Sequence, residues 1–181
     1  DNVFIQRDIE GGDIEAERAS AEVTVTNEFR LNRHAAIPLE SRSVLAAWDD
    51  RRDELTLYLS TQGPHLMRVG IAECLGIKER QLRVVSPDVG GGFGTKGWQY
   101  SEHRLVLWAA RKLERPIKWS CSRSEAVQAD EHGRDNVTDA ELAFDQNGRV
   151  TALRVRTIAN IGAYLSAIRN LLAAFTNVGT L

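Results

Sequence analysis

The stretch STQGPHLMRVGIAECLGIKERQLRVVSPDVGGGFGTKG, residues 60–97, carries most of the structural information in this 181-residue chain. Proline suits the first helical position and Gly76 suits the position just after a helix, so residues 64–75 are predicted to be helical. Residues 81–85, QLRVV, predict a strand, and the glycine cluster VGGGFGTKG follows at residues 89–97. The apolar stripe expected to face the core consists of Leu66, Val69, Ala72 and Leu75.

The flanking sequence predicts further strands and a second long helix. Residues 21–29 alternate apolar and polar side chains, which is typical of a half-buried strand. Residues 98–114 predict a helix whose apolar middle is expected to be buried on most sides. Further strands are predicted at 44–48, 55–59, 117–119, 135–144 and 149–159. The charged turn DDRRDE joins the first two of these strands, and the turn DQNG joins the last two. Residues 171–175 are compatible with a helix.

This order mixes hairpins with crossover helices. The expected class is therefore α+β, with mixed sheets and helices packed on one face. Residues 1–20 are polar and acidic and are expected to be a linker or extended arm, whereas residues 21–181 are expected to form a partial domain truncated at its C-terminus. The single methionine is Met67, so the chain has no initiator and is expected to be a piece of a longer protein.

Composition excludes several classes of protein. Hydrophobic residues make up 43% and charged residues 27%, as in soluble globular domains. The formal net charge of −2 argues against nucleic-acid binding, and no apolar run approaches the roughly 18 residues of a membrane span. Cys74 and Cys121 form no CxxC pair, and both are expected to be buried, reduced thiols of a cytoplasmic protein.

The glycine cluster has two general interpretations. Four glycines within residues 90–94 permit positive φ and leave backbone N–H groups unshielded, so the loop can cradle an anion. It can equally be a tight turn that lets a helix pack on a strand, as in a non-catalytic α/β interaction module. A Walker A loop is excluded because Thr95, not glycine, precedes Lys96.

A dinucleotide-binding loop remains an alternative. The GxGxxG pattern matches at Gly92, Gly94 and Gly97, and Arg123 follows the next strand, where an NADP phosphate would lie. Against this NADP-binding Rossmann-type oxidoreductase stand the four residues that separate the strand from the first glycine. The neighbouring strands also form hairpins rather than successive βαβ units.

Residues 60–97 as a whole resemble the molybdenum hydroxylases, that is, the molybdopterin-binding large subunits of the xanthine dehydrogenase, aldehyde oxidase and aerobic carbon monoxide dehydrogenase family. In that family a strand ends in S/T-Q, and a helix, a strand and GGGFG-x-K follow. Here the two motifs are Ser60-Thr61-Gln62 and residues 90–96. Further matches are IPLESRSVLAAWD (37–49), ERPIKW (114–119), HGRD (132–135) and NIGAY (160–164).

The resemblance implies roles for particular residues. Gln62 would donate its amide to an oxo ligand of molybdenum, a role suited to a neutral group with two donors. Gly91, Gly92, Phe93 and Gly94 would wrap the pterin cofactor, and Phe93 would also shape the substrate pocket. No residue of this chain is expected to ligate the metal directly.

Some features depart from the family or cannot be found in this chain. Purine-hydroxylating members carry Glu immediately after the loop lysine, where this chain has Gly97, which argues against a purine substrate. Glu40 matches a common family glutamate and is expected to have a supporting or structural role, and no function is assigned to Cys121. The family's general-base glutamate and the loop that separates its subtypes would lie beyond residue 181.

The resemblance also implies the wider assembly. The parent would bind molybdenum–molybdopterin, in the cytosine dinucleotide form if bacterial, and would carry out two-electron oxidations with water as oxygen source. Iron–sulfur clusters and FAD would lie on partner subunits or domains, in a cytoplasmic dimer of heterotrimers. The substrate would be a small molecule: carbon monoxide, an aldehyde or an N-heterocycle. The 181-residue chain alone is expected to be inactive.

Overall fold

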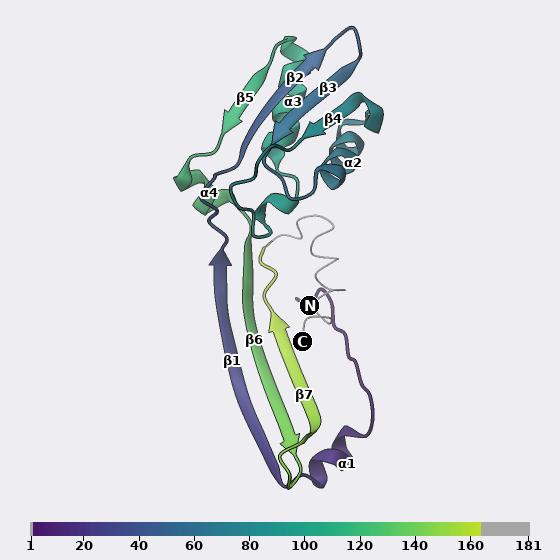
Figure 1. Cartoon of the computed structure of the whole chain (residues 1–181), viewed down its shortest axis with the longest axis vertical. Coiled ribbons are helices and arrows are strands. Elements are labelled where there is room, and N and C mark those ends of the chain that lie inside the picture. Colours follow the sequence, from purple (N-terminus) through teal and green to yellow (C-terminus); the bar gives the residue numbers. More distant parts are fainter. Residues whose placement is uncertain (1, 164–181) are drawn as a thin grey trace. The chain divides into compact units, whose positions relative to one another are not determined.

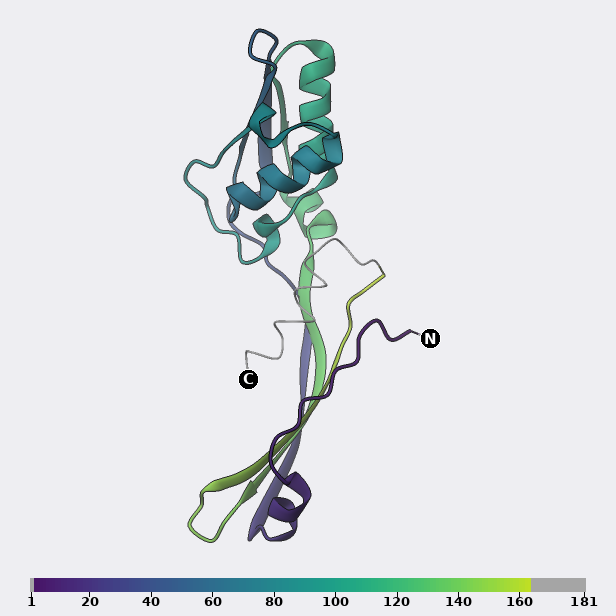
Figure 2. The same ribbon diagram turned by 90° about the vertical axis from the view of Figure 1, so that its right-hand side faces the viewer.

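The computed structural model describes residues 2–163, which divide into two compact units, residues 2–34 with 134–163 and residues 35–133 (Figures 1 and 2). The residue 171–175 helix prediction lies outside the described residues. In chain order the elements are α1 Ile14–Ala19, β1 Val23–Ala35, β2 Ser43–Asp49, β3 Glu54–Leu59, α2 Pro64–Leu75, η1 Glu79–Gln81, β4 Leu82–Val85, η2 Thr95–Gly97, α3 Ser101–Leu113, β5 Ile117–Ser120, α4 Arg123–Ala129, β6 His132–Phe144 and β7 Val150–Ala159.

The unit Ala35–Gly133 is built on a four-stranded mixed sheet in the order β4-β3-β2-β5 (Figure 1). Strand β2 is antiparallel to both β3 and β5, whereas β3 and β4 run parallel. Apolar side chains from alternate sheet positions and from both long helices form one core. The expected α+β class with a mixed sheet is confirmed. The fully buried members of the core include Ala46, Leu57, Ile71, Leu107 and Ala110.

Helix α2 begins at Pro64 and ends at Gly76, as predicted, and Gly76 has the left-handed conformation with φ of 64°. The predicted core stripe was correct for Ala72, which is buried, and for Leu75, which packs against the core, but wrong for Leu66 and Val69, which are 64% and 46% exposed. The buried row is Met67, Ile71 and Ala72, with Leu75 packed beside it. Met67, Ile71 and Leu75 are spaced four residues apart, so they lie along one face of the helix, which packs against the core. The apolar residues of α2 are spread around the helix, so the sequence did not distinguish this face from the others.

Helix α3 is buried on one face only, so the expectation of burial on most sides was wrong. Leu105 is 61% exposed and Trp108 is 52% exposed. The helix packs on a single sheet face, and Lys112 lies over the outward ring of Trp108. The expectation for Cys74 was also wrong, because this thiol is exposed on α2; Cys121 is buried, and both cysteines are unbridged.

Helix α4 was not predicted, although its start was visible in the sequence. Ser122 caps the backbone N–H of Glu125, and the Glu125 carboxylate accepts from the Ser122 N–H. This reciprocal pair is a capping box with S-x-x-E spacing. No helix within residues 2–163 has the length and apolar character that crossing a bilayer requires.

The second unit contains a three-stranded sheet in the order β1-β6-β7. The predicted DQNG turn is confirmed: Asp145 accepts from the backbone N–H groups of Asn147 and Arg149, and Gly148 has φ of 75°. Within residues 1–20, expected as a polar arm, α1 packs on β7 and Arg18 pairs with Glu141. The division into a linker or arm at residues 1–20 and one partial domain at residues 21–181 stays a prediction.

Candidate functional site

The two motifs singled out in the sequence lie side by side because they follow adjacent parallel strands. Gln62 comes just after β3, and the glycine loop comes after β4. The carboxyl ends of parallel neighbours lie at the same edge of a sheet, which is where ligands of such sheets are commonly bound. The Lys96 carbonyl accepts from the Gln62 backbone N–H at 3.0 Å and from the Thr61 hydroxyl at 2.9 Å. The end of the loop is thereby tied to the end of β3.

The orientation of the Gln62 side-chain amide is fixed by the loop. The Gly94 backbone N–H donates to Gln62 Oε1 at 3.0 Å. Since an amide presents its acceptor and its donors on opposite branches, this bond assigns the oxygen and leaves the Nε2 hydrogens directed away from Gly94. Within residues 2–163 the Gln62 side chain makes no hydrogen bond besides the one that its oxygen accepts, so Nε2 has no partner there, and the residue is exposed. The site therefore offers an oriented pair of hydrogen-bond donors.

Glycine is required in this loop for two different reasons. At Gly92 the reason is space, because a Cβ there would lie 2.5 Å from Gln62 Oε1. At Gly91 and Gly94 the reason is conformation, because their φ values are 91° and 94°. Phe93, held between them, has φ of 49° and is 76% exposed. The loop thus leaves exposed backbone at Gly94, beside Gln62, and holds the Phe93 ring in solvent.

An ion pair between the buried Lys96 and the partly exposed Glu40 joins the two ends of the loop. The Lys96 side chain is fully buried, and its Nζ lies 2.6 Å from Glu40 Oε2. The same oxygen accepts from the Ser60 hydroxyl at 2.6 Å and from the Gly90 N–H at 2.7 Å. Partial burial of Glu40 opposes its ionisation, but these three donors outweigh it and lower its pKa below the ordinary value. From the sequence, Glu40 was expected only to have a supporting or structural role, and its pairing with Lys96 was not predicted.

A second buried cluster supports the loop through Tyr100. The Tyr100 hydroxyl donates to the Thr95 carbonyl at 2.9 Å. Arg42, only 2% exposed, stacks 3.6 Å from the centre of the Tyr100 ring and pairs with Asp130 at 2.6 Å. Burial raises the pKa of Tyr100 to about 12, and burial beside Arg42 lowers the pKa of His103 to about 4. Sequence analysis missed this cluster, whose members are spread from residue 42 to residue 130.

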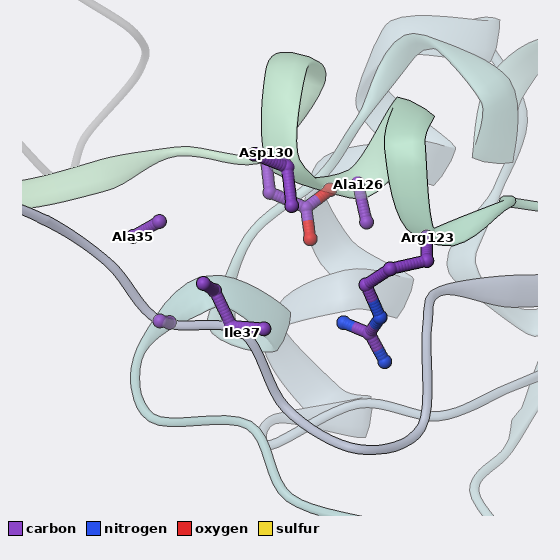
Figure 3. A pocket seen from close by; sticks show the side chains of 7 residues that line it. Ala35, Ile37, Arg123, Ala126 and Asp130 are labelled. Atoms are coloured by element: carbon purple, nitrogen blue, oxygen red, sulfur yellow. The ribbon is translucent and has the colours of Figure 1, made fainter.

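The strand order excludes the dinucleotide-binding alternative. The strand after a dinucleotide-binding loop pairs beside the strand before it, whereas β4 and β5 lie at opposite edges of this sheet. The loop also enters the short helix η2 rather than α3. Arg123, expected to meet a phosphate in that reading, instead donates to the Leu39 carbonyl at 2.7 Å. It lines a small pocket together with Ile37, Ala126 and Asp130 (Figure 3).

No group of three or more His, Cys, Asp or Glu side chains converges as a metal-binding cluster anywhere in residues 2–163. The polar groups gathered at the loop are the Gln62 amide, the exposed glycine backbone and the Glu40–Lys96 pair. They are hydrogen-bonding groups suited to a polar organic ligand rather than to a metal ion held by the protein alone.

The fold and the loop together define an α+β cofactor-binding domain. The chain belongs to the molybdopterin cofactor-binding domain family, whose model matches residues 1–179. It is 35% identical over 164 residues, 91% of the chain, to the nicotine 6-hydroxylase large subunit of Paenarthrobacter nicotinovorans, and 37% identical over 146 residues, 81% of the chain, to the carbon monoxide dehydrogenase large chain of Hydrogenophaga pseudoflava. It covers 20% and 18% of these two proteins, so it spans about a fifth of their length.

Solved structures share the same fold. Quinoline 2-oxidoreductase from Pseudomonas putida 86 matches with a TM-score of 0.76 and 34% identity, over 82% of this chain and 19% of that one. Carbon monoxide dehydrogenase from Oligotropha carboxidovorans matches with a TM-score of 0.73 and 33% identity, over 80% of this chain and 18% of that one. The family expected from residues 60–97 is therefore confirmed.

Proposed function

We propose that this chain is part of the large subunit of a molybdenum-dependent oxidoreductase, and that Gln62, Gly91, Gly92, Phe93 and Gly94 contact its molybdopterin cofactor. The observation that carries the proposal is the locked Gln62 amide. Its oxygen is held by the Gly94 N–H, and its carbonyl end lies where a Gly92 side chain would otherwise be. The two amide hydrogens are left for a ligand that accepts hydrogen bonds.

The residues present fit such a cofactor. Gly94 is exposed, and no heavy atom lies within 4 Å of the place where its Cβ would be, so the loop leaves bare backbone there that a flat polar ring system can approach closely. The exposed Phe93 ring supplies an apolar wall that can exclude water from the reacting atoms. A neutral amide also adds no net charge next to a metal centre. These are properties of this chain's own residues and do not depend on the missing four fifths of the relatives' length.

The proposed mechanism assigns binding and electrostatic roles to this chain. When bound, the cofactor supplies two-electron oxidation with water as the oxygen source. Gln62 holds two donors in place before the reaction, so they stabilise negative charge that develops on the atom they face. The loop and β3, tied through the Lys96 carbonyl, keep those donors from reorienting. The general base and most other cofactor contacts would come from the rest of the large subunit.

The finer assignments rest on the relatives. The names of the similar proteins describe large subunits of a nicotine hydroxylase and of carbon monoxide dehydrogenases, and one names a subunit of a dehydrogenase complex. By analogy, we propose iron–sulfur and FAD partner subunits arranged as a dimer of heterotrimers in the cytoplasm. A molybdopterin cytosine dinucleotide is proposed if the source is bacterial. The proposed substrate is carbon monoxide, an aldehyde or an N-heterocycle.

The test compares two glutamine substitutions in the full-length large subunit. Gln62→Ala is expected to lower turnover by about 10²–10³-fold, the usual effect of losing one preorganised donor, while molybdenum content and thermal stability stay close to wild type. Gln128→Ala removes an exposed side chain on α4 and serves as the matched control. Wild-type turnover in Gln62→Ala, or absence of molybdenum and pterin from the wild-type protein, would contradict the proposal.

A further inference from the structure

The Lys96 ammonium is a buried charge that the proposed mechanism does not use. Its side chain is fully buried, and its charge is balanced by Glu40, whose side chain remains 36% exposed. Burying an ammonium is costly unless it is paired and hydrogen-bonded. An apolar side chain would fill the same space without that cost. A charge kept in this position, next to the candidate cofactor loop, calls for an explanation.

The contacts of the pair show what it holds together. Glu40 binds the start of the loop twice, because its carboxylate accepts from the Gly90 N–H and its own N–H donates to the Gly90 carbonyl at 3.2 Å. Lys96 binds the end of the loop to β3, because its carbonyl accepts from Thr61 and from the Gln62 N–H. The ion pair joins these two ends, so the loop is closed into a ring.

We propose that Glu40 and Lys96 are positioning residues that clamp the two ends of the glycine loop and thereby set the orientation of the Gln62 amide. The effect of this clamp on catalysis rests on the proposed function. The clamp itself is inferred from the contacts within the protein and does not require a bound cofactor. Ser60, just after β3, adds a third donor to the same Glu40 oxygen and ties the clamp to the segment that leads from β3 to Gln62.

The geometry predicts an unequal response to removal of each partner. Glu40→Gln leaves the fully buried Lys96 ammonium without a counter-charge, whereas Lys96→Met leaves a carboxylate that is partly exposed and still bound by Ser60 and Gly90. Glu40→Gln is therefore expected to loosen the loop more than Lys96→Met. The double variant Glu40→Gln/Lys96→Met removes both charges, so it is expected to restore order relative to Glu40→Gln alone.

The experiment measures hydrogen–deuterium exchange of residues 88–97 in the full-length protein without cofactor, together with cofactor content after loading. Exchange in this segment is expected to rise about ten- to a hundredfold in Glu40→Gln, the range expected for loss of a charged hydrogen bond. The rise is smaller in Lys96→Met and partly reversed in the double variant. Glu79→Gln breaks the exposed Arg68–Glu79 pair and is the control, with no expected change in this segment.

The outcomes separate the clamp from the proposed function. Wild-type exchange in residues 88–97 for all three variants, or a double variant no better ordered than Glu40→Gln, would overturn the clamp. If Glu40→Gln does not fold, folding of the double variant supports the clamp and its failure overturns it. Absence of molybdenum and pterin from the wild-type protein would overturn the proposed function alone, because the exchange pattern is measured without cofactor.

Discussion

His103 should make the stability of this protein fall as the solution is acidified from about pH 6.5 to about pH 4. Its side chain is 4% exposed, and burial beside Arg42 lowers its pKa from 6.5 to about 4. At about 1.4 kcal/mol for each pKa unit, this difference corresponds to about 3.5 kcal/mol. The folded state binds fewer protons than the unfolded chain across this interval, so protonation favours unfolding. Above pH 6.5 and below about pH 4, His103 adds no further slope.

The assay is urea denaturation at a series of pH values, for the wild type and for His103→Gln. Glutamine retains an acceptor for the Tyr100 N–H, which donates to His103 Nδ1 at 3.4 Å, but it does not titrate. The expected result is a curve whose slope between pH 6.5 and 4 is reduced in the variant. An unchanged slope, or an NMR titration that places the pKa of His103 near 6.5, would refute the reasoning.

Three further outcomes are expected. Leu57→Ala, at a fully buried position, should reduce the free energy of unfolding by about 2–5 kcal/mol, whereas Leu66→Ala at a 64% exposed position should change it by less than about 1 kcal/mol, both measured by urea denaturation. A thiol reagent should label exposed Cys74 quickly and buried Cys121 slowly under native conditions, and equal rates would contradict the assigned burial. The isolated 181-residue chain should bind no molybdenum cofactor tightly, which metal analysis of the purified chain can check.

The sequence was most informative where local chemistry determines structure. Pro64 and Gly76 bounded α2 correctly, because one lacks an N–H and the other tolerates positive φ. The DQNG turn was predicted for the same kind of reason, and the structure shows Asp145 accepting from the turn backbone. Each of these features is determined by a few consecutive residues, so it can be predicted from the sequence without knowledge of the tertiary packing.

Features that depend on packing were predicted less well. The predicted buried face of α2 was only half correct, because the apolar residues surround much of the helix and only packing on the sheet decides that Met67 and Ile71 face inward rather than Leu66 and Val69. The burial of α3 was overestimated because nothing in its sequence shows that it covers a single sheet face, leaving Trp108 outside.

The candidate site shows the same division. Gln62 and the glycine loop stood out as motifs, and the structure brings them together at the ends of β3 and β4. The partnership of Glu40 with Lys96 crosses 56 positions in the sequence, and no local pattern indicates it. The Arg42–Asp130 pair spans 88 positions and was missed for the same reason.

The most direct test of the central claim is the molybdenum and pterin content of Gly92→Val in the full-length protein, with Gly97→Val as control. A Cβ at Gly92 would lie 2.5–2.7 Å from three atoms of the exposed Gln62 side chain and displace it, whereas a Cβ at Gly97 has no heavy atom within 4 Å. Gly92→Val is expected to fold but to lose most of its cofactor, while Gly97→Val is expected to keep it. Full cofactor content in Gly92→Val would contradict the assignment of this loop to the cofactor.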